Sequence, residues 1–172
     1  TYDGQHVTLT HVGGTLAVSL RPPRLVFAGE DAVVPAAGAA PPGGLRPGRP
    51  RDLPCEPVVL SDGARLDVVV VVEWSPDEGV LRKWARLRLA EDASARLLEE
   101  VVLEELAADE RSFDVLSEGV QSYPAYTDGF FAGIEYPIAA TRLVMDDAGR
   151  RLLLAHRPGA RLVPGEWYTS RK

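Results

Sequence analysis

The segment Arg65–Trp74 (RLDVVVVVEW) decides the class of fold. Its valines are β-branched residues, which favour strands. An uninterrupted apolar run of this length is typical of a central strand that is buried on both faces. Asp62 and Gly63, just before the run, form a hairpin-turn signal. We therefore expect a central β-strand over these residues, entered from a tight turn.

The next segment of the chain predicts a partner for this strand. Ser75–Gly79 (SPDEG) has the residue types of a turn, and Val80–Leu89 (VLRKWARLRL) alternates between polar and apolar residues from Lys83 onward. Trp84 shares its parity with three basic residues, Arg82, Arg86 and Arg88. Since neighbouring residues of a strand point to opposite faces, we expect this tryptophan on the more polar face of the sheet.

Further strand signals lie at both ends of the chain. His6–Thr10 and Thr15–Leu20 alternate around a Gly13–Gly14 turn, which predicts a hairpin. Further short strands are expected at Leu116–Val120, Gly133–Arg142 and Arg151–His156, with Asp146–Gly149 as a hairpin loop between the last two. The pattern contains no repeated alternation of strand and helix, so a doubly wound sheet is disfavoured.

The segment Leu97–Leu106 (LLEEVVLEEL) is open between two interpretations. Its apolar residues are separated by pairs of glutamates, and this spacing fits the stripe of an amphipathic helix better than a strict alternation. The local pattern alone therefore predicts a helix. A strand with irregular alternation is the alternative.

Together these signals predict an all-β, mainly antiparallel protein that forms a two-sheet β-sandwich. A chain of 172 residues is expected to form a single domain, residues 1–172. Residues 28–50 consist largely of Ala, Gly and Pro, so we expect a long loop there. The chain begins at Thr1 and enters a strand pattern at once, from which we expect an excised fragment of a longer protein.

Composition excludes several classes of partner. The net charge of −6 has the wrong sign for a general phosphate-binding surface, so no nucleic acid is expected. The longest apolar run, Val68–Val72, is far shorter than the roughly 18 residues of a spanning helix, so no membrane partner is expected. The single cysteine, Cys55, permits no internal disulfide. The compartment stays open.

The sequence carries no established motif for a cofactor, a metal or a catalytic nucleophile. His6 and His11 form the only close histidine pair, and a spacing of five places them on opposite faces of a continuous strand. His156 ends an apolar strand, where a structural histidine is the commoner role. Cys55 stands beside Glu56, whose charge would raise the pKa of the thiol, so we expect it to be inert.

One segment, Ser122–Pro137 (SYPAYTDGFFAGIEYP), combines aromatic residues with Asp128 and Glu135 on either side of a Phe pair. Aromatic rings beside a carboxylate suit a sugar, because C–H groups pack on the ring while hydroxyls donate to the acid. The other interpretation is a strand entry whose aromatics fill the end of the core. Glu135 is read as a pairing partner of an arginine in preference to a sugar ligand.

Three parts of the chain also carry a resemblance. Asp128–Pro137 (DGFFAGIEYP) resembles a segment in the N-terminal β-sandwich of alpha-galactosidase-like glycoside hydrolases, those of family 36 and their relatives. Val80–Leu89 resembles a strand of that family that follows a Pro-containing turn. Pro164–Ser170 (PGEWYTS) resembles the stretch that precedes the rest of such enzymes.

This resemblance implies a sandwich of the supersandwich, galactose-mutarotase-like type, placed before a (β/α)8 barrel that carries the catalytic aspartates. It also implies that Leu97–Leu106 is a strand. The chain contains no counterpart of that barrel, so no catalytic residue is assigned. The expected partners are a carbohydrate and a C-terminal catalytic domain of the same parent chain.

The leading hypothesis is therefore a non-catalytic N-terminal domain that supports and shapes the sugar site of a glycoside hydrolase. In this hypothesis Asp128 accepts sugar hydroxyls, while Phe130, Phe131 and Trp167 offer stacking faces. No metal ligand and no cofactor is predicted.

Three alternatives remain at this point. The first is a stand-alone carbohydrate-binding or lectin-like module, which requires these aromatic side chains at the surface. The second is a sugar epimerase, which requires a histidine and a carboxylate that converge in a cleft. The third is a structural domain that docks through an exposed apolar strip.

Overall fold

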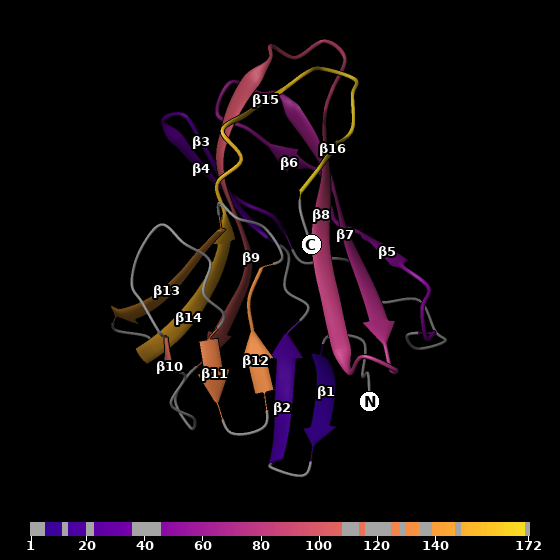
Figure 1. The fold of residues 1–172 in the computed structure, drawn as a ribbon. Helices are drawn as coiled ribbons and strands as arrows, with labels where there is room; N and C mark the ends of the chain where they lie inside the picture. Colours follow the sequence, from indigo (N-terminus) through magenta and orange to yellow (C-terminus); the bar gives the residue numbers. More distant parts are fainter. Residues whose placement is uncertain are drawn as a thin grey trace.

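The computed structural model shows an all-β architecture in which two large antiparallel sheets pack against each other (Figure 1). It describes residues 6–11, 14–19, 23–35, 46–107, 114–115, 125–127, 130–134, 139–146 and 149–170. Within these ranges the chain forms strands and turns and no helix. The predicted two-sheet β-sandwich is confirmed.

The first large sheet is built around the longest strand, β9 (Arg96–Ala107). Its strand order is β13-β14-β9-β3-β4. The short strand β15 lies on the same side of β9 as β14: β15 pairs with the first residues of β9, and β14 pairs with the later ones. The other bounds are β3 (Arg24–Phe27), β4 (Glu30–Val33), β13 (Ala139–Asp146), β14 (Gly149–His156) and β15 (Ala160–Leu162).

The second large sheet has the order β16-β8-β7-β5, with β6 also paired to β7. The valine-rich segment forms β7 (Arg65–Ser75), and it pairs with β8 (Val80–Leu89) from Leu66 to Ser75. The remaining strands are β5 (Arg51–Pro54), β6 (Val58–Val59) and β16 (Tyr168–Thr169). The predicted central strand and its partner are confirmed.

Five short strands form two small sheets, which lie at the lower end of the molecule in Figure 1. They are β1 (His6–His11), β2 (Gly14–Ser19), β10 (Asp114–Val115), β11 (Ala125–Thr127) and β12 (Phe130–Ala132). The β1–β2 hairpin is confirmed. The predicted Leu116–Val120 strand lies outside the described residues.

The bounds predicted for the Gly133–Arg142 strand are wrong. Residues 133–134 follow β12 without being part of a strand, and β13 begins only at Ala139. Ile134 is 8% exposed and packs into the main core. An apolar residue that fills the core from outside a strand has the same sequence pattern as a buried strand residue, so the sequence predicted one continuous strand.

The core lies between the two large sheets. It consists of inward side chains from both, including Leu25 and Phe27 of β3, Leu66 of β7, Leu87 of β8 and Leu152 of β14, all at most 1% exposed. Burying a side chain of this size stabilises the fold by roughly 1.5–3 kcal/mol relative to leaving it in water. The alternation of β7 and β8 therefore fixes which residues remain on the outer face.

Two irregularities in β9 explain the ambiguous LLEEVVLEEL pattern, and the local prediction of a helix is wrong. Opposite β3, Phe27 pairs with Leu98 and Val26 with Glu100, so one glutamate of β9 has no partner residue. Opposite β14, Ala155 pairs with Val102 and Leu154 with Glu104, which leaves a second extra residue. Such β-bulges shift the inward–outward alternation of side chains by one residue, so pairs of consecutive apolar or acidic residues appear in the sequence.

The second bulge places Glu104 in an ion pair with Lys83 of β8, on the opposite sheet. The Lys83 Nζ atom lies 2.8 Å from Glu104 Oε2, and the two side chains are 10% and 6% exposed. Each buried charge thus has a counter-ion, which offsets its cost of desolvation.

The expectation of an uninterrupted loop over residues 28–50 is wrong for its first part. β4 (Glu30–Val33) pairs with β3 around a two-residue turn in which Gly29 has a φ of 80°. That backbone conformation is accessible to glycine at little cost. A sequence dominated by Ala, Gly and Pro conceals this short edge strand. Residues 36–45 lie outside the described ranges.

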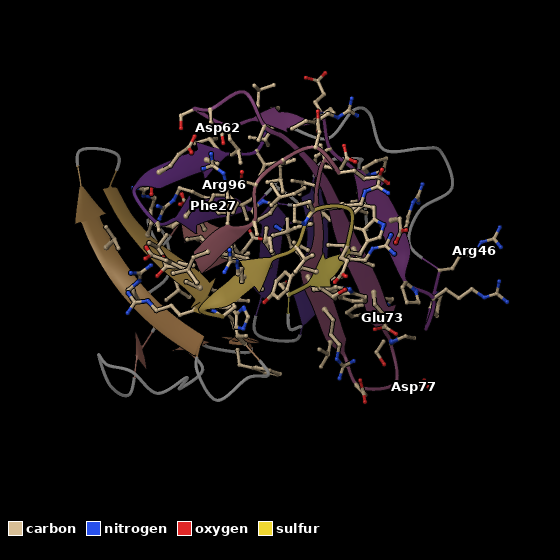
Figure 2. All side chains as sticks on the ribbon, turned by 90° about the horizontal axis from the view of Figure 1, so that it is seen from above. Phe27, Arg46, Asp62, Glu73, Asp77 and Arg96 are labelled. Atoms are coloured by element: carbon tan, nitrogen blue, oxygen red, sulfur yellow. The ribbon has the colours of Figure 1, made fainter. Side chains whose placement is uncertain are left out.

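A second polar cluster joins the two sheets at the end where Asp62 and Arg96 lie side by side (Figure 2). Glu30 of β4 accepts hydrogen bonds from the Ser61 backbone nitrogen at 2.6 Å and from Arg96 Nη1 at 2.9 Å. The hydrogen bond from Ser61 and the charge of Arg96 lower the pKa of Glu30 despite partial desolvation. The cluster thereby fixes the β6–β7 turn against β9.

The substitutions Lys83→Met and Glu104→Leu test the buried ion pair. Each single change leaves the other charge buried, so we expect the free energy of unfolding to fall by about 3 kcal/mol. The double variant removes both charges and is expected to recover most of that loss. Urea denaturation measures all three, and Glu99→Gln, at an exposed position of the same strand, is the control. A double variant as unstable as the sum of the singles would contradict this role.

Candidate functional site

The exposed indole of Trp167 is placed on the outer face of the second large sheet by the strand that follows it. Tyr168 of β16 lies opposite Leu87 of β8 and packs against the main core. Because side chains alternate along a strand, Trp167 and Thr169 lie on the outer side. Trp167 is 45% exposed.

Backbone hydrogen bonds hold this segment against β8. The Gly165 nitrogen donates to the Leu89 carbonyl oxygen at 2.9 Å, and the Ser170 nitrogen donates to the Ala85 carbonyl oxygen at 2.8 Å. Gly165 has a φ of 78°, and a Cβ atom there would approach Glu91 Cγ to 3.3 Å. Glycine therefore allows the tight turn that starts the segment. Trp167 lies between two fixed points.

Two arginines of β8 flank this indole. The guanidinium carbon of Arg88 lies 4.7 Å from the ring centroid of Trp167, and that of Arg86 lies 5.5 Å from it. Both distances are within the range of cation–π attraction. The arginines share the outer face because the apolar residues between and beside them, Leu87 and Leu89, are directed into the core.

Two aspartates hold the arginines in place. Arg86 pairs with Asp52 of β5, and Arg88 Nη2 donates to Asp67 Oδ2 of β7 at 2.8 Å. Arg65 Nε donates to the other oxygen of Asp67 at 3.1 Å. The Arg88 hydrogen bond lowers the pKa of Asp67, and Arg65 adds to this effect against a partial desolvation. The carboxylate is therefore ionised at neutral pH.

We call this group of residues the Trp167 face; it comprises Asp52, Arg65, Asp67, Arg86, Arg88 and Trp167. It combines an exposed aromatic ring with three guanidinium groups and two carboxylates on a single sheet surface. Such a surface provides an aromatic ring on which the C–H groups of a ligand can pack, with hydrogen-bond donors and acceptors beside it.

Of the predicted site residues, Phe131 and Trp167 are the two whose side chains the structure describes, and they lie on different sheets. Phe131 of β12 is 60% exposed, but β12 belongs to the small β10-β11-β12 sheet and not to the sheet that carries Trp167. Phe130 begins β12, and its side chain lies outside what the structure describes, as does Asp128 as a whole. Only Trp167 is described with charged neighbours.

Sequence reasoning missed the charged members of the Trp167 face, although one signal pointed to them. The shared parity of Arg86, Arg88 and Trp84 correctly predicted a polar face of β8. Trp84, however, is only 8% exposed. The exposed tryptophan of this face is Trp167, which reaches it from a distant part of the chain. No local pattern encodes that pairing.

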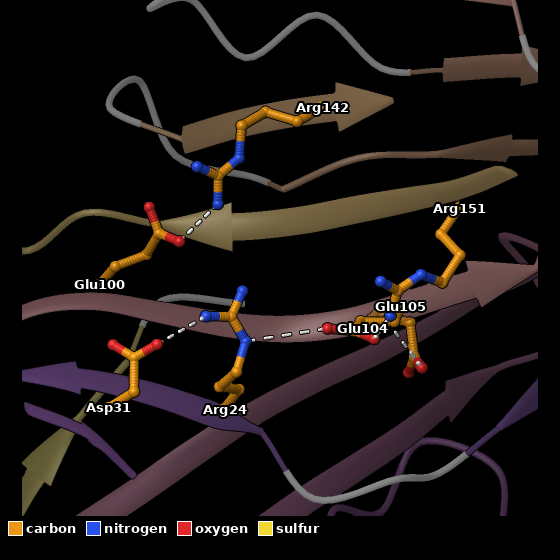
Figure 3. Close-up of polar contacts among 7 residues, drawn as sticks. All are labelled: Arg24, Asp31, Glu100, Glu104, Glu105, Arg142 and Arg151. Atoms are coloured by element: carbon orange, nitrogen blue, oxygen red, sulfur yellow. Dashed lines mark hydrogen bonds and ion pairs between the residues drawn. The ribbon is translucent and has the colours of Figure 1, made fainter. Parts of the chain in front are cut away.

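The outer face of the other large sheet carries an ion-pair network (Figure 3). Glu100 of β9 pairs with Arg142 of β13 and accepts a hydrogen bond from Arg157 Nε at 2.8 Å. Glu105 lies 2.8 Å from Arg151 Nη1 and 3.8 Å from Arg24 Nε. Beside this network a small apolar cluster of Val102, Leu153 and Ala155 is buried. The outer polar surface of this sheet is therefore structural.

The environment of Glu100 affects its ionisation. Burial alone would raise the pKa of this carboxyl group, because desolvation disfavours the charged form. The hydrogen bonds and charges of Arg157 and Arg142 outweigh burial, so the pKa lies below its ordinary value. Glu100 is thus an ionised partner of two arginines.

The remaining reactive residue types form no cluster. Within the described residues, no group of three or more His, Cys, Asp or Glu could hold a metal ion. Burial raises the pKa of the Cys55 thiol, which agrees with its expected inertness. His156 is 2% exposed at the end of β14. No helix in the part of the chain that the structure describes has the length and hydropathy to cross a membrane.

Comparison with known proteins identifies no relative of this chain. No protein-family model, no curated protein and no solved structure matches the chain. The function proposed below rests on the contacts of the chain's own residues.

The ion pairs of Glu100 predict a pH-dependent stability. Its pKa is lower in the folded chain than the roughly 4.3 of an unfolded glutamate. Its contribution is therefore complete above that value and is lost as the pH falls through the folded pKa. Glu100→Gln is expected to cost roughly 2 kcal/mol at pH 7, with a gap to the wild type that narrows below about pH 4.

Urea denaturation across this pH range measures the gap, and Glu99→Gln, the exposed neighbour, is the matched control. A gap that stays constant down to about pH 2 would show that the carboxylate charge of Glu100 does not stabilise the fold.

Proposed function

We propose that this chain is a non-catalytic β-sandwich domain of a carbohydrate-active enzyme, and that it contacts sugar through the Trp167 face. The observation that carries this proposal is the exposed indole of Trp167, held on a sheet surface beside ion pairs of aspartates and arginines. An aromatic ring packs against the C–H groups of a sugar, and the surrounding charges exchange hydrogen bonds with its hydroxyls.

The described carboxylates support a non-catalytic role. Glycoside hydrolysis requires one carboxyl group that is protonated near neutral pH and a second carboxylate nearby. Asp67 has a lowered pKa, and Asp52 is ion-paired. The two buried glutamates among the described residues, Glu100 and Glu104, are also ion-paired. All four are paired with basic side chains, and the pKa values of Asp67 and Glu100 are lowered by their arginine partners.

The catalytic carboxylates are accordingly proposed to come from another domain of the parent chain. The resemblance to alpha-galactosidase-like glycoside hydrolases of family 36 names that domain as a (β/α)8 barrel. In this proposal the sandwich supports the barrel and contributes a wall of the sugar site. The confirmed two-sheet sandwich is compatible with it.

A stand-alone carbohydrate-binding module is the second candidate. It requires aromatic side chains at the surface, and both Phe131 and Trp167 meet that requirement at 60% and 45% exposure. It differs from the leading proposal in binding sugar without a partner domain. Binding by the chain on its own therefore separates the two.

Calorimetry with galactose, glucose and α-linked oligosaccharides tests the proposed site. Under the stand-alone alternative we expect weak binding, with a dissociation constant between about 10 μM and 10 mM, that Trp167→Ala weakens at least tenfold through loss of about 1.4 kcal/mol of packing. Phe131→Ala is the control, because it removes another exposed aromatic ring, which lies on a different sheet. If only the parent chain binds, the same pair of variants is compared in that chain.

Two results would contradict the proposal. Hydrolysis of nitrophenyl galactosides by this chain alone would show that it is itself catalytic. Equal sugar binding by wild type and Trp167→Ala, in the isolated chain and in its parent, would exclude the Trp167 face as the contact surface.

A further inference from the structure

The charges of the Trp167 face do not balance. Three guanidinium groups, those of Arg65, Arg86 and Arg88, lie among two carboxylates, Asp52 and Asp67. Asp67 is shared by two arginines, and it uses one oxygen for each. The face therefore has one positive charge in excess, in a chain whose net charge is −6.

The arginines also have donor capacity beyond their aspartate partners. A guanidinium group carries five N–H donors in a planar fork. Arg88 uses Nη2 for Asp67, and Arg86 uses Nη2 for Asp52. The Nε atom of Arg86 is buried, so a ligand can reach this side chain only through its Nη atoms. Both side chains are partly exposed, at 42% for Arg88 and 36% for Arg86, so a ligand on the indole lies within reach of these donors.

We infer that the saccharide bound on the Trp167 face is acidic, a glycan whose uronic-acid carboxylate is bound by Arg88 and Arg86 while its ring packs on Trp167. This inference rests on the proposed function and names the class of sugar for the same site. An arginine fork matches the geometry of a carboxylate and makes two parallel, charge-assisted hydrogen bonds to it. A neutral sugar has no carboxylate with which to form these charge-assisted hydrogen bonds.

The face is organised before any ligand arrives. The aspartates fix the guanidinium groups of Arg86 and Arg88 from one side, and the indole lies against both. A carboxylate that enters this site therefore orders few additional side chains, which limits the entropic cost of binding.

The negative net charge of the whole chain does not contradict an acidic ligand. At physiological ionic strength, charges separated by more than about 8 Å are largely screened, so the groups within the Trp167 face dominate. The same net charge disfavours a long polyanion such as a nucleic acid, which needs an extended basic surface. A short acidic oligosaccharide needs only a local one.

Asp67 competes with the ligand carboxylate for Arg88 and Arg65. Replacing it by the isosteric, neutral Asn releases both guanidinium groups from an ion pair and raises the excess charge of the face. The Asp67→Asn variant is therefore expected to bind an acidic sugar more tightly than the wild type does. A gain of affinity is a result that misfolding cannot produce.

The test uses an α-1,4-linked galacturonate trisaccharide and its methyl ester, in which each carboxylate is replaced by an uncharged ester with one added methyl group. Calorimetry at low and at raised salt compares them on the form of the chain in which sugar binding is found. We expect the acid to bind at least about tenfold more tightly than the ester, with the difference reduced by salt.

Three variants separate the contributions of the arginine charge and of the indole ring to saccharide affinity. Arg88→Gln is expected to weaken binding of the acid about tenfold and binding of the ester by less, whereas Asp67→Asn is expected to strengthen binding of the acid several-fold. Trp167→Ala is expected to weaken both ligands. Arg161→Gln, at an exposed position of β15, is the control for a general loss of positive charge.

The outcomes separate this inference from the proposed function. Equal binding of acid and ester, or binding of neutral sugars only, with loss in Trp167→Ala, would overturn the acidic ligand and leave the sugar-binding face intact. Acid binding that survives Trp167→Ala and Arg88→Gln would place the acidic site elsewhere and overturn the inference. Absence of any saccharide binding, in the chain and in its parent, would overturn both.

Discussion

Burial of one side of the β7–β8 pair against β9 and β3 is the constraint on which the rest of this structure depends. Apolar area removed from water stabilises a fold in proportion to its extent, and here it is concentrated in Leu66, Val68, Leu87 and Leu89 together with their counterparts on the opposite sheet. Since successive side chains of a strand point to opposite faces, burying these residues places their neighbours along each strand on the outer face. The arginines of β8 and Asp67 of β7 are on the outer surface for the same reason that the leucines are inside, so the candidate site is a consequence of how the core is packed.

The long strand β9 shows how a sandwich accommodates charge at its centre. Each of its two bulges turns a pair of consecutive residues toward one face, so acidic and apolar side chains appear in doublets. One glutamate meets Lys83 of the opposite sheet, and another meets Arg142 and Arg157 on the outer face. Ion pairs therefore join β9 to the opposite sheet on its inner face and to arginines on its outer face. A shift in the register of β9 would break the ion pairs on both faces at once.

The parts of the fold that depend on local pattern could be predicted from the sequence, whereas those that depend on long-range pairing could not. The alternation of Val80–Leu89 and the β-branched run before it specify two strands, their hairpin and their polar face. The doublets of β9 read locally as a helix, because a bulge and a helical stripe place apolar residues at similar spacings. The position of Trp167 beside Arg86 and Arg88 depends on the pairing of β16 with β8. The residues next to Trp167 in the sequence do not specify which strand β16 pairs with.

That pairing has a consequence for how the molecule assembles. The hydrogen bond from the Ala85 nitrogen to the Ser170 hydroxyl closes a separation of 85 residues. Contacts of such high sequence separation are entropically expensive and are favoured only after the strands between them are in place. The β7–β8 hairpin needs no such delay, since its strands are joined by a short turn. We therefore expect the basic surface of β8 to form before Trp167 packs against it, so that an assembled Trp167 face indicates that β16 has paired with β8.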